Sequence, residues 1–169
     1  MDENPTITLT GPLEPRDSWT AANCPLDRAL QVVGTRSAML LLREAFYGTT
    51  RFADFAARVG ISEPVAAARL RELADAGLIE RAPYQEPGQR TRLGYQLTQQ
   101  GAELLPALVA LMHWGDKWLG SAGVELRHHD CGEPVTAELH CAAGHHPAAG
   151  EVDLVSRPRG PARVGAQPG

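Results

Sequence analysis

Cysteine and histidine side chains, which can bind metal ions, gather in the C-terminal third of this 169-residue chain. Thiolate and imidazole are the usual ligands of zinc, and zinc-ribbon knuckles hold the metal with Cys-x-x-Cys pairs. The pattern is incomplete here, because Gly144 stands where the second cysteine of a knuckle would be. Two interpretations stay open: a zinc site, or a small extension whose histidines lie on the surface. The candidate zinc ligands are Cys131, Cys141 and His145, beside His128, His129, His140 and His146.

Cys24 is a candidate for thiol chemistry of another kind. It directly precedes Pro25 at the start of an expected helix, where the helix N-terminus can lower the pKa of a thiol. Because the thiolate reacts with oxidants, Cys24 could sense oxidation; the alternative is a structural cysteine buried near a subunit interface. The chain has three cysteines at unrelated spacings, which argues against a secreted disulfide framework and favours a reducing compartment.

Catalytic chemistry is not indicated. The sequence has no Ser-His-Asp order, no glycine-rich phosphate loop and no intact metal motif, so we expect no enzyme and no cofactor other than the zinc just considered. The composition, 43% hydrophobic and 21% charged, is typical of a globular domain, and no apolar run approaches the roughly 20 residues that span a bilayer. The N-terminus starts acidic and lacks the basic and apolar segments of a secretory signal. We therefore expect a cytoplasmic bacterial protein.

The charged residues are unevenly distributed along the chain. The net charge is -4, but residues 24–120 carry 11 Lys and Arg against 10 Asp and Glu. The remaining residues carry 5 positive and 10 negative side chains. This mild asymmetry favours a nucleic-acid-binding domain with acidic flanks.

Four amphipathic helices are expected before residue 78. Apolar residues recur at spacings of three and four, and a glycine follows each helical stretch. Ser37 can cap the second helix and Ser62 the fourth, in which Pro64 falls in the first turn, where proline is tolerated. The third and fourth helices are joined by a tight turn at Gly60, which is a helix-turn-helix arrangement. The expected helices span residues 26–33, 38–47, 52–59 and 63–76.

Two strand-like stretches follow, over residues 78–84 and 91–97, with the polar segment 85–90 between them. A β-hairpin directly after a helix-turn-helix is a wing. A long helix is then expected over residues 103–119, interrupted near its start by Pro106. A helix this apolar needs a partner, and in a small protein that partner is usually a second copy.

These elements predict a mainly α fold with a small β-hairpin wing (α+β), a winged helix-turn-helix, followed by a short β-rich C-terminal extension. Alternating residues within the extension favour two or three short strands between residues 124 and 156. The expected parts are an N-terminal arm (1–23), flexible or docked on a partner, the winged helix-turn-helix domain (24–120), a Cys/His-containing β extension (121–156) and a disordered tail (157–169).

Five ordered blocks between Cys24 and Leu119 resemble the HxlR-type, MarR-related winged-helix transcriptional regulators. The resemblance implies a homodimer, held by its N-terminal and C-terminal helices, that binds an operator in double-stranded DNA and represses or activates transcription. It also implies that the second helix of the helix-turn-helix enters the major groove. Cys24 resembles an N-terminal cysteine that some members of the family use for redox sensing. The blocks are CPLDRALQVVG with TRSAMLLLREAFYG, then RFADFAARVGIS, RLRELADAGLIERAPYQ, YQLTQQG and LLPALVALMHWGDKW.

If residues 63–76 form the recognition helix, a rotation of 100° per residue sorts its two faces. Arg71 could pair with guanine or phosphate, whereas the alanines on its side could only touch thymine methyl groups. Arg69 falls on the inner side, which favours a structural salt bridge over a phosphate contact. The side chains expected to face the core are Val65, Ala66, Leu70 and Leu73. The groove-facing candidates are Ser62, Pro64, Ala67, Ala68 and Arg71.

Three further arginines are candidates for contacts with the DNA backbone. Arg90 and Arg92 flank the expected tip of the wing, where they suit phosphate or the minor groove; the alternative is a solvated hairpin. Arg51 directly precedes the third helix and could clamp a phosphate. Because the groove-facing side is rich in alanine, the rival function is a winged-helix protein-interaction module that does not bind DNA. The sequence indicates no particular small-molecule effector.

Overall fold

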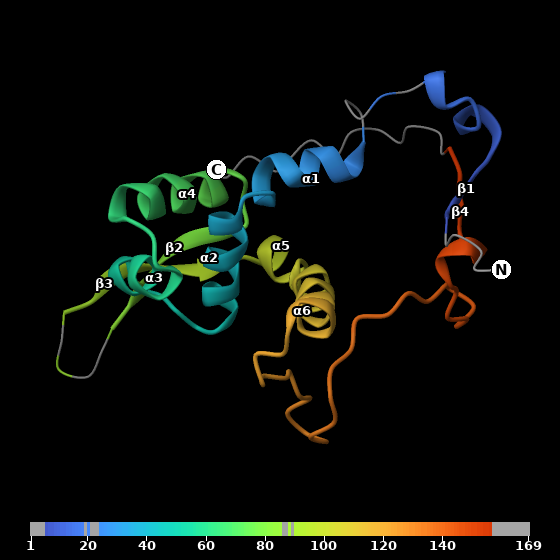
Figure 1. Cartoon of the computed structure of the whole chain (residues 1–169). Coiled ribbons are helices and arrows are strands. Elements are labelled where there is room, and N and C mark those ends of the chain that lie inside the picture. The colour runs from blue at the N-terminus through green and yellow to red at the C-terminus, as the bar shows by residue number, and fades with distance from the viewer. Residues whose placement is uncertain (1–5, 19, 21–23, 86–87, 89, 157–169) are drawn as a thin grey trace. The chain divides into compact units, whose positions relative to one another are not determined.

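A computed structural model describes residues 6–18, 20, 24–85, 88 and 90–156 (Figure 1). The chain divides into two compact units. The larger unit is Asn23–Ala137, and the smaller unit consists of Met1–Ala22 together with Glu138–Gly169. None of the helices in these described ranges combines the length and the apolar character needed to cross a membrane.

Helices make up most of the larger unit, as the sequence predicts. The second helix begins earlier than expected, because Thr35 and not Ser37 caps it: the Thr35 side chain accepts a hydrogen bond from the backbone N–H of Ala38 at 3.2 Å. Pro106 does not interrupt the last helix but is its second residue, a position where its missing N–H costs nothing. The helices are α1 (Pro25–Val33), α2 (Arg36–Phe46), α3 (Phe52–Val59), α4 (Glu63–Asp75), α5 (Gln99–Ala102) and α6 (Leu105–Leu119).

The hydrophobic core lies between α2, α3, α4 and the first strand of the wing. Each helix contributes residues at spacings of three or four, so that one apolar side of each meets the others. The ring of Phe55 meets that of Tyr95 edge to face, with 6.1 Å between ring centroids. The largest fully buried side chains are Phe55, Leu41, Leu42, Leu70, Leu73 and Ile79.

The wing is an antiparallel hairpin of β2 (Ile79–Tyr84) and β3 (Arg92–Leu97), in which Ile79 pairs with Leu97. The backbone N–H of Tyr95 donates to the carbonyl oxygen of Thr50 at 2.9 Å, which ties β3 to the segment before α3. Gly94 makes this approach possible, since a Cβ there would lie 2.7 Å from the Thr50 oxygen. The wing is therefore fixed to the helix-turn-helix.

The smaller unit contains a parallel pair of two-residue strands, β1 (Thr8–Leu9) and β4 (Asp153–Leu154). The described part of the N-terminal arm thus pairs with the extension of its own chain, a contact that the sequence pattern did not indicate. The 3-10 helices that the structure describes beside these strands are η1 (Gly11–Leu13), η2 (Arg16–Ser18) and η4 (Ala149–Glu151).

The C-terminal extension holds less strand than its alternating pattern predicts. Between residues 121 and 156 the structure has β4 and one isolated bridge, between Arg127 and Pro134. Prolines lack the N–H that a ladder needs, and glycines weaken a strand, so the two prolines and four glycines of this segment limit pairing. The expected disordered tail, 157–169, lies outside the described residues.

Candidate nucleic-acid interface

The turn between α3 and α4 has the backbone conformation that its glycine allows. Gly60 ends α3 with φ 70° and ψ 41°, in the left-handed region that glycine adopts without strain. Ser62 occupies the N-cap position of α4, but its side chain makes no capping hydrogen bond in the described structure. Both Ser62 and Pro64, which follows in the first turn, are exposed. These two candidates are therefore accessible to solvent at the N-terminal end of α4.

The remaining groove-facing candidates on α4 differ in exposure. Ala68 and Arg71 are exposed, and Ala67 is half-buried. Val65 was expected in the core, but it is 43% exposed. A helix turns about 100° per residue, so Val65 lies at the edge of the buried side centred near Ala66, and not within it. Val65 is therefore an exposed apolar candidate for contact with DNA, which was not predicted from the sequence.

The charges along α4 nearly cancel. Arg69 forms an ion pair with Glu72, one turn further along the helix. This confirms the structural salt bridge that the sequence favoured for Arg69. Arg71 stays exposed, while Glu63 and Asp75 are exposed acids near the two ends of the helix. The helix alone therefore offers little attraction for phosphate, and a favourable field must come from neighbouring elements.

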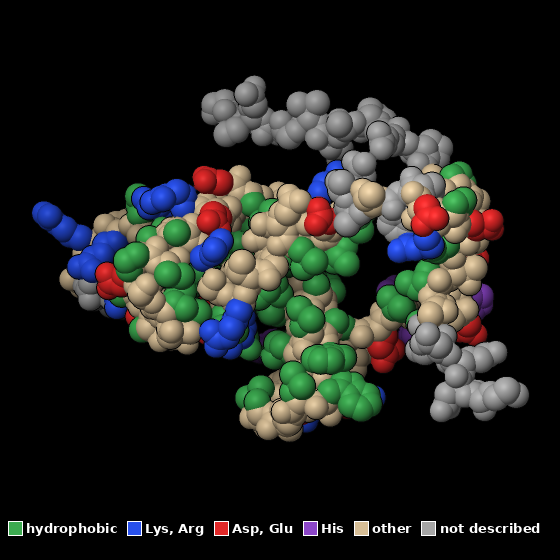
Figure 2. Space-filling model, turned by 45° about the horizontal axis from the view of Figure 1, so that its top comes forward, with side chains coloured by type: hydrophobic (Ala, Val, Ile, Leu, Met, Phe, Trp, Pro, Cys, Tyr) green, Lys and Arg blue, Asp and Glu red, His purple; other side chains and the backbone are tan. Residues whose placement is uncertain are grey.

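The wing supplies further exposed arginines. Arg90 and Arg92 are both exposed, and Arg92 is the first residue of β3. Figure 1 shows the outer ends of β2 and β3 and the start of α4 at the same end of the larger unit, and in Figure 2 Lys and Arg side chains gather at that end. Arg81 of β2 is a further exposed arginine, stacked 5.6 Å from the centre of the Tyr95 ring, that the sequence analysis did not single out. Arg51 takes the N-cap position of α3 and is half-buried.

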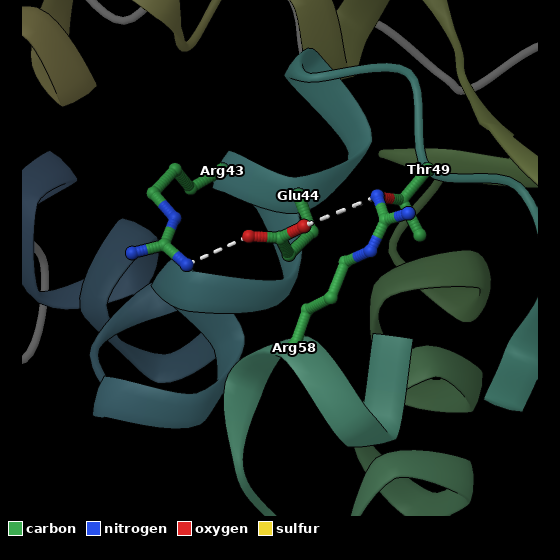
Figure 3. Close-up of polar contacts among 4 residues, drawn as sticks. All are labelled: Arg43, Glu44, Thr49 and Arg58. Atoms are coloured by element: carbon green, nitrogen blue, oxygen red, sulfur yellow. Dashed lines mark hydrogen bonds and ion pairs between the residues drawn. The ribbon is translucent and has the colours of Figure 1, made fainter. Parts of the chain in front are cut away.

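A polar network holds α3 against the end of α2 (Figure 3). Glu44 is only 5% exposed; it accepts hydrogen bonds from Arg43 Nη2 at 2.7 Å and from the Thr49 hydroxyl at 3.1 Å. Arg58 of α3 donates to the same hydroxyl at 2.9 Å, and its Nη1 lies 4.0 Å from the Glu44 carboxylate. The sequence signal was a glutamate within an apolar helix, and its partners could not be identified from spacing alone. This network sets the position of the first helix of the helix-turn-helix.

The three cysteines lie in different surroundings. Cys24 is half-buried at the N-cap position of α1, whereas Cys131 and Cys141 are exposed. Cys131 Sγ lies 3.1 Å from Nδ1 of His128, and Cys141 Sγ lies 3.5 Å from Nδ1 of His145. Hydrogen bonds from the backbone near Cys141, the largest of them at His145, lower the pKa of that thiol. Cys131 belongs to the larger unit, and Cys141 and His145 to the smaller one.

Zinc binding stays a prediction. Within the described ranges there is no group of three or more His, Cys, Asp or Glu side chains placed to hold a metal ion. Each Cys–His pair supplies two ligands, while a structural zinc takes four. Elemental analysis of the purified protein tests the prediction: one equivalent of zinc per chain that a strong chelator removes slowly would support the site, and metal-free protein would favour the alternative of surface histidines.

Comparison with known proteins agrees with this geometry. Residues 32–122 match the model of the HxlR-like helix-turn-helix family. The uncharacterised HTH-type transcriptional regulator Rv3095 of Mycobacterium tuberculosis is 44% identical over 117 residues, which cover 68% of this chain and 73% of the relative. The uncharacterised HTH-type regulator sll1512 of Synechocystis is 33% identical over 103 residues, covering 60% and 75%.

Two solved structures are also similar. PA1607, described as a candidate transcription factor, superposes with a TM-score of 0.70 and 36% identity, over 81% of this chain and 96% of its own. The candidate transcription factor PA1374 from Pseudomonas aeruginosa superposes with a TM-score of 0.51 and 30% identity, over 82% and 94%.

A DNA-binding helix-turn-helix transcriptional regulator is the class of protein that this fold and these relatives define. Within that class, the chain belongs to the HxlR-like helix-turn-helix family. The family and the relatives are transcriptional regulators and not enzymes, as the sequence predicts.

Proposed function

We propose that the protein binds an operator in double-stranded DNA sequence-specifically as a homodimer. In this proposal α4 enters the major groove, and the β2–β3 loop contacts phosphates or the minor groove. The observation that carries it is that the start of α4 and the outer ends of β2 and β3 lie at one end of the larger unit (Figure 1), where Lys and Arg side chains gather (Figure 2). Base edges and the flanking backbone can then be contacted together. Because bacterial DNA lies in the cytoplasm, the protein would act there.

The homodimer is supported by apolar side chains that α1 and α6 leave exposed. On α6, Leu108 and Val109 pack inward, while Leu111, Trp114 and Trp118 form a separate stripe at spacings of three and four and are 56–64% exposed. Exposed apolar patches of this kind mark interaction surfaces. On α1, Leu26 is 64% and Leu30 is 51% exposed. A second copy would cover both helices through a twofold contact.

The function is tested by titrating the purified protein against DNA from upstream of its own gene at two salt concentrations. We expect tight binding that weakens steeply with salt, because phosphate contacts release counterions. Footprinting should protect two half-sites about 10 base pairs apart. Absence of binding to any DNA at low salt would instead favour the protein-interaction module.

The proposed interface predicts the effect of charge on the α6 stripe. Trp114→Glu combined with Trp118→Glu should convert the dimer into monomers at micromolar concentrations, because two carboxylates would be buried without partners. Sedimentation velocity measures the change. Ala102→Glu, at an exposed position outside the stripe, is the matched control. A double variant that stays dimeric would remove α6 from the interface.

We further propose that Cys24 senses oxidation. It stands half-buried at the start of α1, next to the exposed Leu26 of the proposed interface, so that oxidation of its thiol can alter the dimer. A mild oxidant should weaken DNA binding at least several-fold, and Cys24→Ser should abolish the response. Cys131→Ser and Cys141→Ser are the controls and should respond like the original protein. If Cys24→Ser still loses DNA on oxidation, the sensing role is wrong.

A further inference from the structure

The first two turns of α4 present apolar side chains to solvent. At about 100° per residue, Ala68 lies opposite the buried side of the helix, and Pro64 and Val65 lie on either side of it in the preceding turn. Val65 is 43% exposed, and Pro64 and Ala68 are exposed as well. When a helix-turn-helix binds DNA, the N-terminal residues of its second helix are those that contact base edges. The part of α4 that is placed to read sequence is therefore apolar.

The same two turns lack the side chains that usually identify bases by hydrogen bonding. Paired hydrogen bonds select guanine through Arg or Lys and adenine through Asn or Gln, and residues 62–68 contain none of these residue types. Arg69 comes next, but it is half-buried and paired with Glu72. The Glu63 carboxylate only accepts hydrogen bonds, so it cannot pair with the acceptor atoms of guanine. The Ser62 hydroxyl both donates and accepts, and therefore distinguishes bases poorly. Apolar contact is what remains for reading sequence at this end of α4.

Thymine is the base that offers an apolar group in the major groove, its C5-methyl group. A valine in a helix holds one strongly preferred rotamer, so Val65 presents its two methyl groups with little side-chain entropy left to lose. The short side chains of Pro64 and Ala68 let the helix approach the bases closely. We propose that Val65 makes operator binding specific for thymine, by packing on the C5-methyl group of one thymine in each half-site. This inference rests on the proposed DNA binding and names the base that α4 selects.

Replacing thymine by uracil in the footprinted half-sites tests the proposal, because uracil lacks the methyl group and forms the same base pair. Burial of one methyl group corresponds to roughly fourfold in affinity. We therefore expect about 15-fold weaker binding of the dimer when both half-sites contain uracil, measured by competition fluorescence anisotropy. Uracil in the flanking DNA outside the footprint should have no effect. At the contacted position, 5-methylcytosine should bind more tightly than cytosine, because it restores the methyl group.

Variants of the protein assign the effect to Val65. In Val65→Ala the ratio of affinities for thymine and uracil operators should fall close to one, and the fold should persist, because the position is exposed and alanine favours a helix. Val65→Thr keeps one of the two methyl groups and should retain part of the ratio. Val155→Ala, at a valine of the smaller unit that is 52% exposed, is the matched control and should keep the ratio of the original protein.

Three results would overturn the proposal. Equal affinity for thymine and uracil operators, with binding still steep in salt, would refute the methyl contact and leave the proposed function standing. An effect of uracil that is equally large in Val65→Ala would arise from the shape of the DNA and not from this side chain. Absence of binding to any DNA at low salt would refute the proposed function and the thymine readout together.

Discussion

Replacing Arg90 and Arg92 together by alanine should weaken DNA binding by roughly a thousandfold near 0.1 M salt. Both side chains are exposed beside the wing loop and extend beyond the core, so their removal leaves the fold intact. A dimer would lose about four phosphate contacts, and each contributes about 0.9 to the slope of log affinity against log salt. The slope should therefore fall by about 3 to 4, which fluorescence anisotropy at several salt concentrations measures directly.

Comparison with other variants separates the wing from the recognition helix. Because phosphate contacts carry no sequence information, the wing variant should lose affinity equally for operator and unrelated DNA. Arg71→Ala should instead weaken operator binding by about 1–3 kcal/mol if it contacts guanine, with less effect on unrelated DNA. Arg36→Ala is the control for loss of an exposed arginine elsewhere. An unchanged salt slope in the wing variant would mean that its arginines are merely solvated.

The wing should dominate the electrostatic attraction because α4 contributes little of its own. Arg69 is neutralised by Glu72, and the exposed Arg71 is offset by Glu63 and Asp75. The helix is therefore suited to close contact with bases through small side chains, while the attraction for the backbone comes from the hairpin. This division of roles also explains why the net charge of the chain gives so little indication of DNA binding.

Local signals in the sequence sufficed to predict α1 to α4, α6 and the wing, but not the four-residue helix α5. Gly60 both ends α3 and forms the tight turn, since its left-handed conformation suits glycine, and the polar segment 85–90 separates two strands of the expected type. The exact residue at which a helix begins depends on backbone geometry, which the sequence pattern does not give. Ser37 and Thr35 are both good caps, and only the backbone decides that Thr35 reaches the N–H of Ala38.

Contacts between distant residues could not be predicted in this way. The pairing of Glu44 with Arg58 joins two helices, and the Gly94 approach to Thr50 joins a strand to a turn. Neither leaves a periodic signal along the chain. A groove lined by Arg43 lies between α2, α6 and the irregular segment that follows α6, so its lining residues lie far apart in the sequence. Such features follow from packing, which a single sequence does not specify.

Phe55→Ala should be the most destabilising single change in the larger unit that we consider. The side chain is 0% exposed, and its removal should cost about 3–5 kcal/mol in free energy of unfolding, through lost burial and the cavity left behind. A domain is stabilised by only about 5–15 kcal/mol, so a large part of that margin would disappear. Urea denaturation, with Leu93→Ala as an exposed control in β3, measures the difference.

The Phe55→Ala substitution should also weaken DNA binding, because Phe55 connects the helix-turn-helix to the wing. Its ring packs edge to face on Tyr95, whose backbone N–H in turn bonds to Thr50 just before α3. Loss of the ring therefore loosens the wing relative to the helix-turn-helix, even in molecules that stay folded. Phe55→Leu keeps most of the volume and should retain both stability and affinity better than Phe55→Ala. A loss of less than about 1 kcal/mol in Phe55→Ala would mean that the core closes around the cavity, and that the wing keeps its position without the Phe55 ring.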